Sequence, residues 1–289
     1  MNQLSFAVIV AFFPEVHQLT RLCESLKNYV NVIVVDNTPE GNKLPSLDFC
    51  TWISNNRNIG IAGAQNIGIR EAIRQGAESI FFFDQDSYFF EDFILTLINS
   101  LKKIGSGVVA PVCINAATNQ EYPSFRLSSI GWPRSVYNSG SKTPVNVDLA
   151  ISSGSIVSSD VFNLVGLMDE SLFIDYVDFE WCARVRKAGL PIIIEPNAIM
   201  LHSIGRLNTK SFGLNICIHS SERSYYRMRN SFLLFRYRHI YFLYALYSTF
   251  SRVIHYPLEC LYSKDPYLHL KMGWRGMYDG ILGRREGLQ

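Results

Sequence analysis

The chain has 289 residues, of which 48% are hydrophobic and 18% are charged, and its 27 basic side chains nearly balance 25 acidic ones. This composition predicts a folded protein with a large core, and the net charge of +2 disfavours a protein that binds nucleic acid through a basic surface. The six cysteines form no C-x-x-C pair, which excludes a zinc ribbon and predicts reduced thiols, as in cytoplasmic proteins.

Short apolar runs alternate with helical patterns over the first 113 residues. The predicted strands span residues 6–11, 32–35, 51–54, 79–83 and 108–113, and the predicted helices span 14–26, 61–74 and 90–103. This alternation is typical of a mainly parallel sheet flanked by helices. In such sheets ligands bind beyond the carboxyl ends of the strands.

The middle of the chain is less regular. Residues 115–146 contain Pro123, Pro133 and Pro144 without a clear period, which predicts a long functional loop or an insertion. Further strands are predicted at 149–157 and 192–194, and a helix at 177–187.

The end of the chain, from residue 222, is predicted to be helical, aromatic and basic. Between Arg223 and Arg285 there are 11 Lys and Arg against 3 Asp and Glu, a net charge of +8. The most apolar stretch, 232–250, is interrupted by charged residues, so we predict no membrane span. Helices of this kind suit the surface of an anionic membrane, and the alternative is a core between helices or a homodimer interface.

Polar residues follow two of the predicted strands directly. Asp84-Gln85-Asp86 presents two carboxylates that can hold Mg²⁺ or Mn²⁺, and such a cation can bridge to a diphosphate. Asp36, which precedes Asn37, can accept a hydrogen bond from the imide N–H of a uracil or thymine ring. The simpler alternative for both pairs is a polar turn.

Two further segments carry candidate residues. The small residues from Asn58 to Gly68 allow a helix start to approach a nucleotide phosphate, or a helix to pack tightly on the sheet. In residues 173–184, acidic side chains cluster where a helix begins. One explanation is that the helix dipole stabilises acidic side chains at this position. The alternative is that one of them is a general base and that Arg184 holds the acids in place. His202 follows a predicted strand and is a candidate metal ligand or a structural histidine.

Taken in order, these segments resemble the glycosyltransferases of family 2 over residues 5–205. The resemblance implies the GT-A fold, an α/β Rossmann-like architecture with a mixed, mainly parallel sheet flanked by helices. Residues 1–215 would form the GT-A domain, with a nucleotide-sugar half at about 1–113 and an acceptor half at about 114–215. Residues 216–289 would form a helical extension that binds a membrane or a second subunit.

The resemblance also implies roles for individual residues. Asp178 would be the catalytic base, with Asp175 as its rival and Arg184 beside them. The metal ligands would be Asp84, Asp86 and His202, and the acceptor would contact Gly154, Glu180 and Trp181. The nucleotide sugar would contact Ala11, Phe12, Asp36, Asn37, Asn58, Gly60, Asn66, Asp84, Gln85 and Asp86.

The chain departs from the family pattern at two places. Val177 stands where the family has a Glu before the catalytic Asp. Ala11-Phe12-Phe13 stands where the family has Thr-Tyr-Asn, so hydroxyl contacts are lost there although Phe12 could still stack on a base.

Three stretches resemble bacterial rhamnosyltransferases in particular: residues 82–87, residues 173–182 and residues 225–230. This resemblance implies an inverting, metal-dependent transfer of L-rhamnose from dTDP-L-rhamnose in the synthesis of O-antigen or another surface polysaccharide. The acceptor would be a polyprenyl-diphosphate-linked saccharide, and the enzyme would lie on the cytoplasmic face of the bacterial inner membrane. The alternatives are another UDP- or GDP-sugar donor and a non-catalytic binding scaffold. A nucleotidyltransferase is disfavoured because no Gly-rich basic loop follows the first strand.

Overall fold

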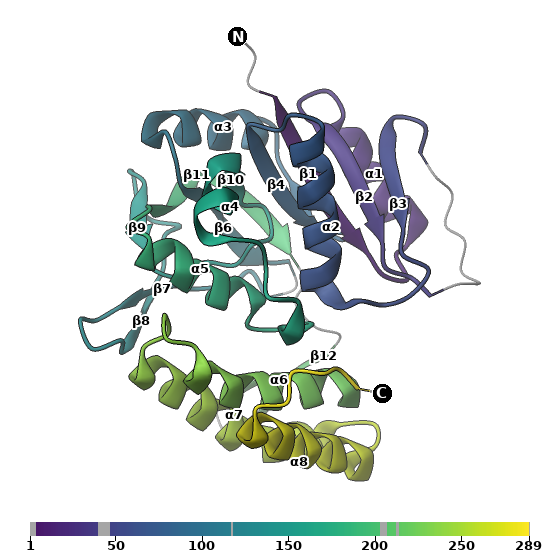
Figure 1. The fold of residues 1–289 in the computed structure, drawn as a ribbon, viewed down its shortest axis with the longest axis vertical. Helices are drawn as coiled ribbons and strands as arrows, with labels where there is room; N and C mark the ends of the chain where they lie inside the picture. Colours follow the sequence, from purple (N-terminus) through teal and green to yellow (C-terminus); the bar gives the residue numbers. More distant parts are fainter. Residues whose placement is uncertain (1–3, 40–46, 117, 203–206, 212–213, 289) are drawn as a thin grey trace.

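The computed structural model describes residues 4–39, 47–116, 118–202, 207–211 and 214–288, with the side chains of 202–217 outside the description. At its centre lies a nine-stranded sheet (Figure 1). Its strands are β1 (Ser5–Ala11), β2 (Asn31–Asp36), β3 (Cys50–Ser54), β4 (Ser79–Asp84), β5 (Tyr88–Phe89), β6 (Val108–Asn115), β9 (Val145–Val147), β10 (Ile156–Ser158) and β11 (Ile192–His202). The spatial order is β3-β2-β1-β4-β10-β6-β11-β5, and β9 pairs with β11.

Six strands of this sheet run in one direction, because β1, β2, β3 and β4 pair in parallel and β6 pairs in parallel with β11. β10 lies antiparallel between β4 and β6, and β5 and β9 are antiparallel to β11. The predicted α/β class with a mixed, mainly parallel sheet is confirmed.

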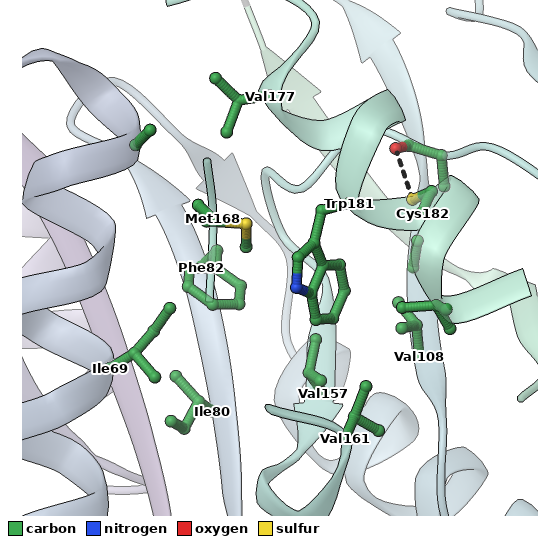
Figure 2. Close-up of a cluster of buried hydrophobic side chains, with 14 of the residues drawn as sticks. Ile69, Ile80, Phe82, Val108, Val157, Val161, Met168, Val177, Trp181 and Cys182 are labelled. Atoms are coloured by element: carbon green, nitrogen blue, oxygen red, sulfur yellow. Dashed lines mark hydrogen bonds between the residues drawn. The ribbon is translucent and has the colours of Figure 1, made fainter. Parts of the chain in front are cut away.

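Helices cover both faces of the sheet. α1 (Val16–Leu26) and α3 (Phe93–Ile104) cover one face, and α2 (Gly60–Arg74), α4 (Ser159–Val165) and α5 (Val177–Lys187) cover the other. Side chains alternate between the two faces of a strand, so Val8 packs with α2 while Ile9 packs with α1. Burial on both faces explains why the strands read as continuous apolar runs. Figure 2 shows the core under α5, where Trp181 lies among Phe82, Val108 and Val157.

The C-terminal helices form a further layer beside α5 (Figure 1). They are α6 (Ser221–Leu233), the short 3-10 helix η2 (Leu234–Arg236), α7 (Phe242–Tyr262) and α8 (Pro266–Leu282). α8 packs closely on α6 at Gly276, because this residue has no Cβ. A Cβ there would lie 2.3 Å from the carbonyl oxygen of Tyr225. Leu233 and Tyr244 belong to the same buried cluster as α5, so this layer shares the core of the sheet. No helix in the described ranges is long and apolar enough to cross a membrane.

Several elements differ from the predicted pattern. The strand predicted at 149–157 is only β10, because the preceding Ser-Ser-Gly-Ser segment forms a turn in which Gly154 has a φ of +76°. The region 115–146 is not one loop, since it contains the hairpin of β7 (Ser124–Leu127) and β8 (Pro133–Val136) as well as β9. The short elements η1 (Glu170–Leu172), β12 (Leu207–Ser211) and β13 (Leu214–Ile218) lack a periodic signal and were not predicted.

Candidate active site

The carboxyl ends of the parallel strands open into a cleft of about 420 Å³. In the register of the sheet, Asp36 pairs with Ala11 and Asp84 pairs with Val10, so the two carboxylates stand on either side of the end of β1. The cleft is lined by Ile61, Asp84, Asp86, Ile151, Ser152, Ser153, Ile174, Asp175, Tyr176, Val177, Asp178, Phe179 and Arg223. The topology therefore brings the predicted acidic pair and the predicted base to one cavity.

Gln85 connects the acidic turn to the end of β1. Its Oε1 accepts a hydrogen bond from the Phe12 backbone N–H at 2.7 Å, and its Nε2 donates to the Phe12 carbonyl at 3.2 Å. The Phe12 ring is 41% exposed and packs edge-on against Phe13. An exposed aromatic ring on a backbone held at both polar atoms is suited to stacking on a planar base.

Asn37 and Asn58 shape the loop that leads into α2. Asn37 Nδ2 donates to Asn58 Oδ1 at 2.9 Å, and Asn37 Oδ1 accepts from the Ile59 N–H at 3.1 Å. Asn58 Oδ1 also accepts from the Gly60 N–H at 3.0 Å. Asn37 and Asn58 are therefore both hydrogen-bonded within the protein. Asp36 is also buried, and its carboxylate accepts from the Thr38 N–H at 2.9 Å in a turn.

Two residues of α2 that the resemblance assigned to the nucleotide sugar have structural contacts. Gly60 has a φ of +78°, and a Cβ there would lie 2.6 Å from the carbonyl oxygen of Phe173. Asn66 is buried outside the cleft, where its amide donates to the Met168 carbonyl at 2.9 Å and its Oδ1 accepts from the Met168 N–H at 2.9 Å. Asn66 therefore ties α2 to the segment before η1 and does not reach the cleft.

Asp178 lies in the first turn of α5 and faces the cleft. Its Oδ2 accepts from the Ser152 N–H and its Oδ1 from the Ser152 hydroxyl, both at 3.1 Å. Burial raises the pKa of Asp178 to about 6, the negative charges of Asp84 and Asp175 add to the rise, and the two hydrogen bonds from Ser152 limit it. A carboxylate with a pKa near 6 is suited to accept a proton at neutral pH.

Asp175 is held differently from Asp178. Arg223 donates to both of its carboxylate oxygens at 2.9 Å. Burial is the largest single influence on Asp175 and would raise its pKa, but the charge of Arg223, the hydrogen bonds from Arg223 and the charge of Arg227 together outweigh burial and hold the pKa below its usual value. Asp175 is thus the weaker proton acceptor of the two. Arg223 was not predicted as a site residue, because no local spacing signals a contact across 48 residues.

The three remaining candidates on α5 point away from the cleft. Arg184 donates to both oxygens of Glu180, at 2.9 and 2.8 Å, and to neither Asp175 nor Asp178. Trp181 donates to the Gly166 carbonyl at 2.9 Å and is buried in the core (Figure 2). Glu180, Trp181 and Arg184 lie on the protein-facing side of the helix. The structure therefore does not place them for acceptor binding or for holding the catalytic acids.

Gly154 and His202 have backbone positions that the structure defines. A Cβ on Gly154 would lie 2.7 Å from the sulfur of Met200, so this residue allows the serine turn to pack beside the cleft. His202 is the last residue of β11 and pairs in register with Asn115, and its side chain lies outside the described residues.

Asp84 and Asp86 fit a divalent cation that also binds a diphosphate. Both line the cleft and both offer hard oxygen ligands from one short turn. Mg²⁺ is commonly held by one or two carboxylates together with substrate phosphates and water. Within the part of the chain whose side chains are described, no group of three or more His, Cys, Asp or Glu side chains is arranged so that it could hold a metal ion by itself. A cation held by Asp84 and Asp86 would therefore be completed by phosphate and water oxygens.

The fold and the cleft define a class of protein. Residues 7–157 match the family model described as glycosyl transferase family 2. The chain belongs to this family, has its GT-A fold, and is a glycosyltransferase.

One relative extends the match over nearly the whole chain, and another covers part of it. The dTDP-rhamnosyl transferase RfbF of Shigella flexneri is 39% identical over 99% of this chain and 98% of its own length. The low-salt glycan biosynthesis hexosyltransferase Agl10 of Haloferax volcanii is 25% identical over 64% of this chain and 63% of its own length.

Solved structures share the fold at lower sequence identity. S. aureus TarS in complex with UDP-GlcNAc has a TM-score of 0.58 at 14% identity, covering 97% of this chain and 81% of that one. GalNAc-T7 with UDP, GalNAc and Mn²⁺ has a TM-score of 0.57 at 17% identity, covering 73% of this chain and 44% of that one.

Proposed function

We propose that this glycosyltransferase transfers L-rhamnose from dTDP-L-rhamnose to a hydroxyl group of a saccharide acceptor during the synthesis of a bacterial surface polysaccharide such as O-antigen. The observation that carries the proposal is the 39% identity to the S. flexneri dTDP-rhamnosyl transferase, which extends over 99% of the chain. It therefore includes the acid-rich segment and the C-terminal helices as well as the nucleotide half.

The proposed reaction is a single displacement with inversion. Asp178 accepts the proton of the acceptor hydroxyl, the hydroxyl oxygen attacks the anomeric carbon of rhamnose, and the bond from that carbon to the diphosphate breaks. Asp36 and the Phe12 ring contact the thymine base, and Asp84 and Asp86 would hold Mg²⁺ or Mn²⁺. When bound, such a cation neutralises charge on the departing diphosphate. The raised pKa of Asp178 and the engagement of Asp175 by Arg223 both support Asp178 as the base.

A donor panel tests the proposal. Purified protein is given dTDP-rhamnose, UDP-glucose, UDP-galactose or GDP-mannose with Mg²⁺ or Mn²⁺, with and without a lipid-linked acceptor, and release of the nucleoside diphosphate is measured. We expect metal-dependent turnover of dTDP-rhamnose alone. Turnover of a UDP- or GDP-sugar instead would overturn the rhamnose proposal and leave the family unchanged.

We also propose that α7 and α8 hold the enzyme on the cytoplasmic face of the inner membrane, close to a polyprenyl-diphosphate-linked acceptor. Large apolar side chains are exposed on both helices, among them Phe242, Phe250, Leu261, Tyr267, Trp274 and Tyr278. Exposed basic residues accompany them, at Lys264, Lys271, Arg275, Arg284 and Arg285. Apolar side chains that insert between lipids and basic side chains that attract anionic head groups together favour binding to a membrane surface.

Flotation with vesicles tests the membrane proposal. We expect binding to vesicles that contain an anionic lipid, weaker binding to neutral vesicles, and release at high salt. The variant Trp274→Ser with Tyr278→Ser should float less. Absence of binding, together with a dimer in sedimentation that these substitutions dissociate, would show instead that the surface is a subunit interface.

A further inference from the structure

The loop that leads into α5 has an unusual backbone. Phe173, Asp175 and Tyr176 have φ angles of 65°, 62° and 64°. These values lie in the left-handed region, which residues other than glycine rarely adopt. Such a conformation persists only where the surrounding structure holds it. Tyr176 is the N-cap of α5, and Asp178 is the second residue of that helix. The conformation of residues 171–176, which comprise the end of η1 and the turn after it and are called the loop below, therefore sets the direction in which Asp178 points.

Asn230 of α6 binds the loop along its length. Its side chain is fully buried, and Nδ2 lies 2.8 Å from the Leu172 carbonyl oxygen, 2.8 Å from that of Ile174 and 3.1 Å from that of Asp175. Three carbonyl oxygens thus converge on one amide nitrogen, which carries two hydrogens. A left-handed loop turns its carbonyl groups to one side, and Asn230 satisfies them there.

Arg229 extends the same contact. Its side chain is fully buried, and Nη2 donates to the Ser171 carbonyl at 2.6 Å while Nε donates to Asn230 Oδ1 at 3.0 Å. Nη1 donates to the Glu286 carbonyl at 2.8 Å, which adds the C-terminal tail to the arrangement. Burying a charge is costly unless the charge is hydrogen-bonded. The bonds that Arg229 makes to the loop, to Asn230 and to the tail compensate this cost. Arg229 also fixes the orientation of the Asn230 amide.

Phe173, within this loop, contacts both α6 and the nucleotide half. The Phe173 ring stacks on Tyr226 of α6, with ring centres 4.4 Å apart. The Phe173 carbonyl oxygen accepts from the Ile61 N–H at 2.7 Å, at the start of α2. The loop is therefore clamped between α2 and α6, and α6 provides most of its polar contacts.

We propose that Asn230 and Arg229 are positioning residues of the glycosyl transfer: by holding the carbonyl groups of residues 171–175, they keep the strained loop in the conformation that directs Asp178 into the cleft. This inference rests on the proposed role of Asp178 as the base. It assigns α6 to the catalytic unit, in contrast to the sequence pattern, which predicted α6 as part of an extension for membrane binding or dimerisation.

Asn230→Asp is the direct test. The substitution keeps the volume but replaces the N–H donors by a carboxylate that faces three carbonyl oxygens. Displacement of a reacting group by about 1 Å can cost on the order of 10²-fold, so we expect kcat to fall by about 10- to 100-fold. The KM for the nucleotide sugar and the Kd for dTDP should stay within about twofold, because the loop does not carry the nucleotide contacts. The expected split between kcat and KM is one that a general loss of structure would not produce.

Ser231→Ala is the matched control. Ser231 is the next residue of α6, is equally buried, and donates its hydroxyl to the Met228 carbonyl within the helix without contacting the loop. We expect its kcat to be unchanged. Hydrogen exchange of the amides of residues 171–176 should accelerate in Asn230→Asp and not in Ser231→Ala. A folded Asn230→Asp enzyme with the kcat of the wild type, or a fall in kcat without faster exchange in the loop, would overturn the inference.

Asn230→Ala covers the case in which the aspartate variant does not fold, because it removes the donors without burying a charge. We expect a fall in kcat of about tenfold, and a wild-type kcat would refute the positioning role. Asp178→Asn is measured in the same assay. If Asp178→Asn retains the wild-type kcat, the proposed base is wrong. If Asp178→Asn is inactive and the Asn230 variants are fully active, only the positioning role is wrong.

Discussion

The two sides of the cleft hold their carboxylates by different means. Asp36 and Asp84 stand at the ends of β2 and β4, the two parallel strands that flank β1, so the register of the sheet places them. Asp178 stands at the start of α5, after a left-handed loop that α6 binds from 55 or more residues further along the chain. The strand-end carboxylates of the donor side are therefore placed by the register of the sheet, whereas the acceptor side depends on the packing of the C-terminal helices.

The acceptor side also separates two carboxylates that are three residues apart. Arg223 pairs with Asp175 and helps to hold its pKa low, while burial raises the pKa of Asp178 to about 6, since no cation among the described side chains pairs with it. The same stretch of sequence thus supplies one structural carboxylate and one suited to proton transfer. Substituting these carboxylates one at a time should separate their roles.

Asp178→Asn should have the largest effect. Loss of a general base typically costs 10²–10⁴-fold, and we expect kcat to fall by about this factor while the Kd for dTDP stays within about twofold. Turnover assays and calorimetric titration measure the two quantities. Asp160→Asn is the control, since Asp160 lies on α4 and binds the Ser106 hydroxyl. A fall of less than about tenfold in Asp178→Asn would exclude this residue as the base.

Asp86→Asn should damage the donor side instead. Loss of one of two carboxylate ligands should lower kcat/KM by about 10²-fold or more and raise the Mn²⁺ concentration that gives half-maximal turnover. Chelation with EDTA should abolish wild-type turnover, and added Mg²⁺ or Mn²⁺ should restore it. Asp92→Asn, at an exposed position ahead of α3, is the control. Full turnover in the presence of EDTA would contradict the metal dependence.

The pH profile should reflect Asp178 and not Asp175. A base acts only when ionised, so kcat/KM should fall about tenfold per pH unit below a pKa of about 6. Asp175, whose pKa lies below its usual value, is already ionised over the pH range of the measurement, from 4.5 to 8. If kcat/KM instead began to fall only near pH 4, the result would be inconsistent with a base in the buried environment of Asp178. The measurement is kcat/KM between pH 4.5 and 8, with stability checked at each pH.

Asp175→Asn should affect stability. Removing one partner from a largely buried ion pair should lower the free energy of unfolding by about 1–3 kcal/mol at pH 7, measured by urea titration. Because the folded-state pKa of Asp175 is lowered, its contribution is present above the ordinary pKa and is lost as the pH falls through the folded-state value. The difference between variant and wild type should therefore shrink toward pH 3.

Arg70→Gln provides the smallest expected effect and the control for the ion pair. Arg70 pairs with Glu170 at 3.3 Å with both side chains more than half exposed, so the loss should be within about 0.5 kcal/mol. A loss as large as that of Asp175→Asn would show that exposure does not explain the difference between the two pairs.

The α/β class, the parallel strands and the strand-end acids can be predicted from the amino-acid sequence. These features follow from local patterns, because apolar runs of strand length, helical periodicity and polar residues at strand ends act within a few residues of one another. The helix at 177–187 was predicted with its observed bounds, Val177–Lys187. Asp84, Asp86 and Asp178 were predicted as site residues, and the structure places all three on one cleft.

Which polar residues of these segments face the cleft depends on tertiary packing and cannot be read from the sequence. Asn66, Glu180, Trp181 and Arg184 have the residue types of a binding site, but they are engaged by groups inside the protein. Whether a helical side chain faces a cavity or the core depends on how the helix is rotated and packed, and composition does not encode that rotation.

The role of α6 also became visible only in the folded chain. Arg223 contacts Asp175 across 48 residues, and Asn230 contacts Leu172 across 58. Hydrogen bonds of this kind have no sequence period, because their geometry arises when separately formed elements pack together. The acidic residues can therefore be predicted from the chain itself, whereas the helix that orients the catalytic loop is defined only by the tertiary structure.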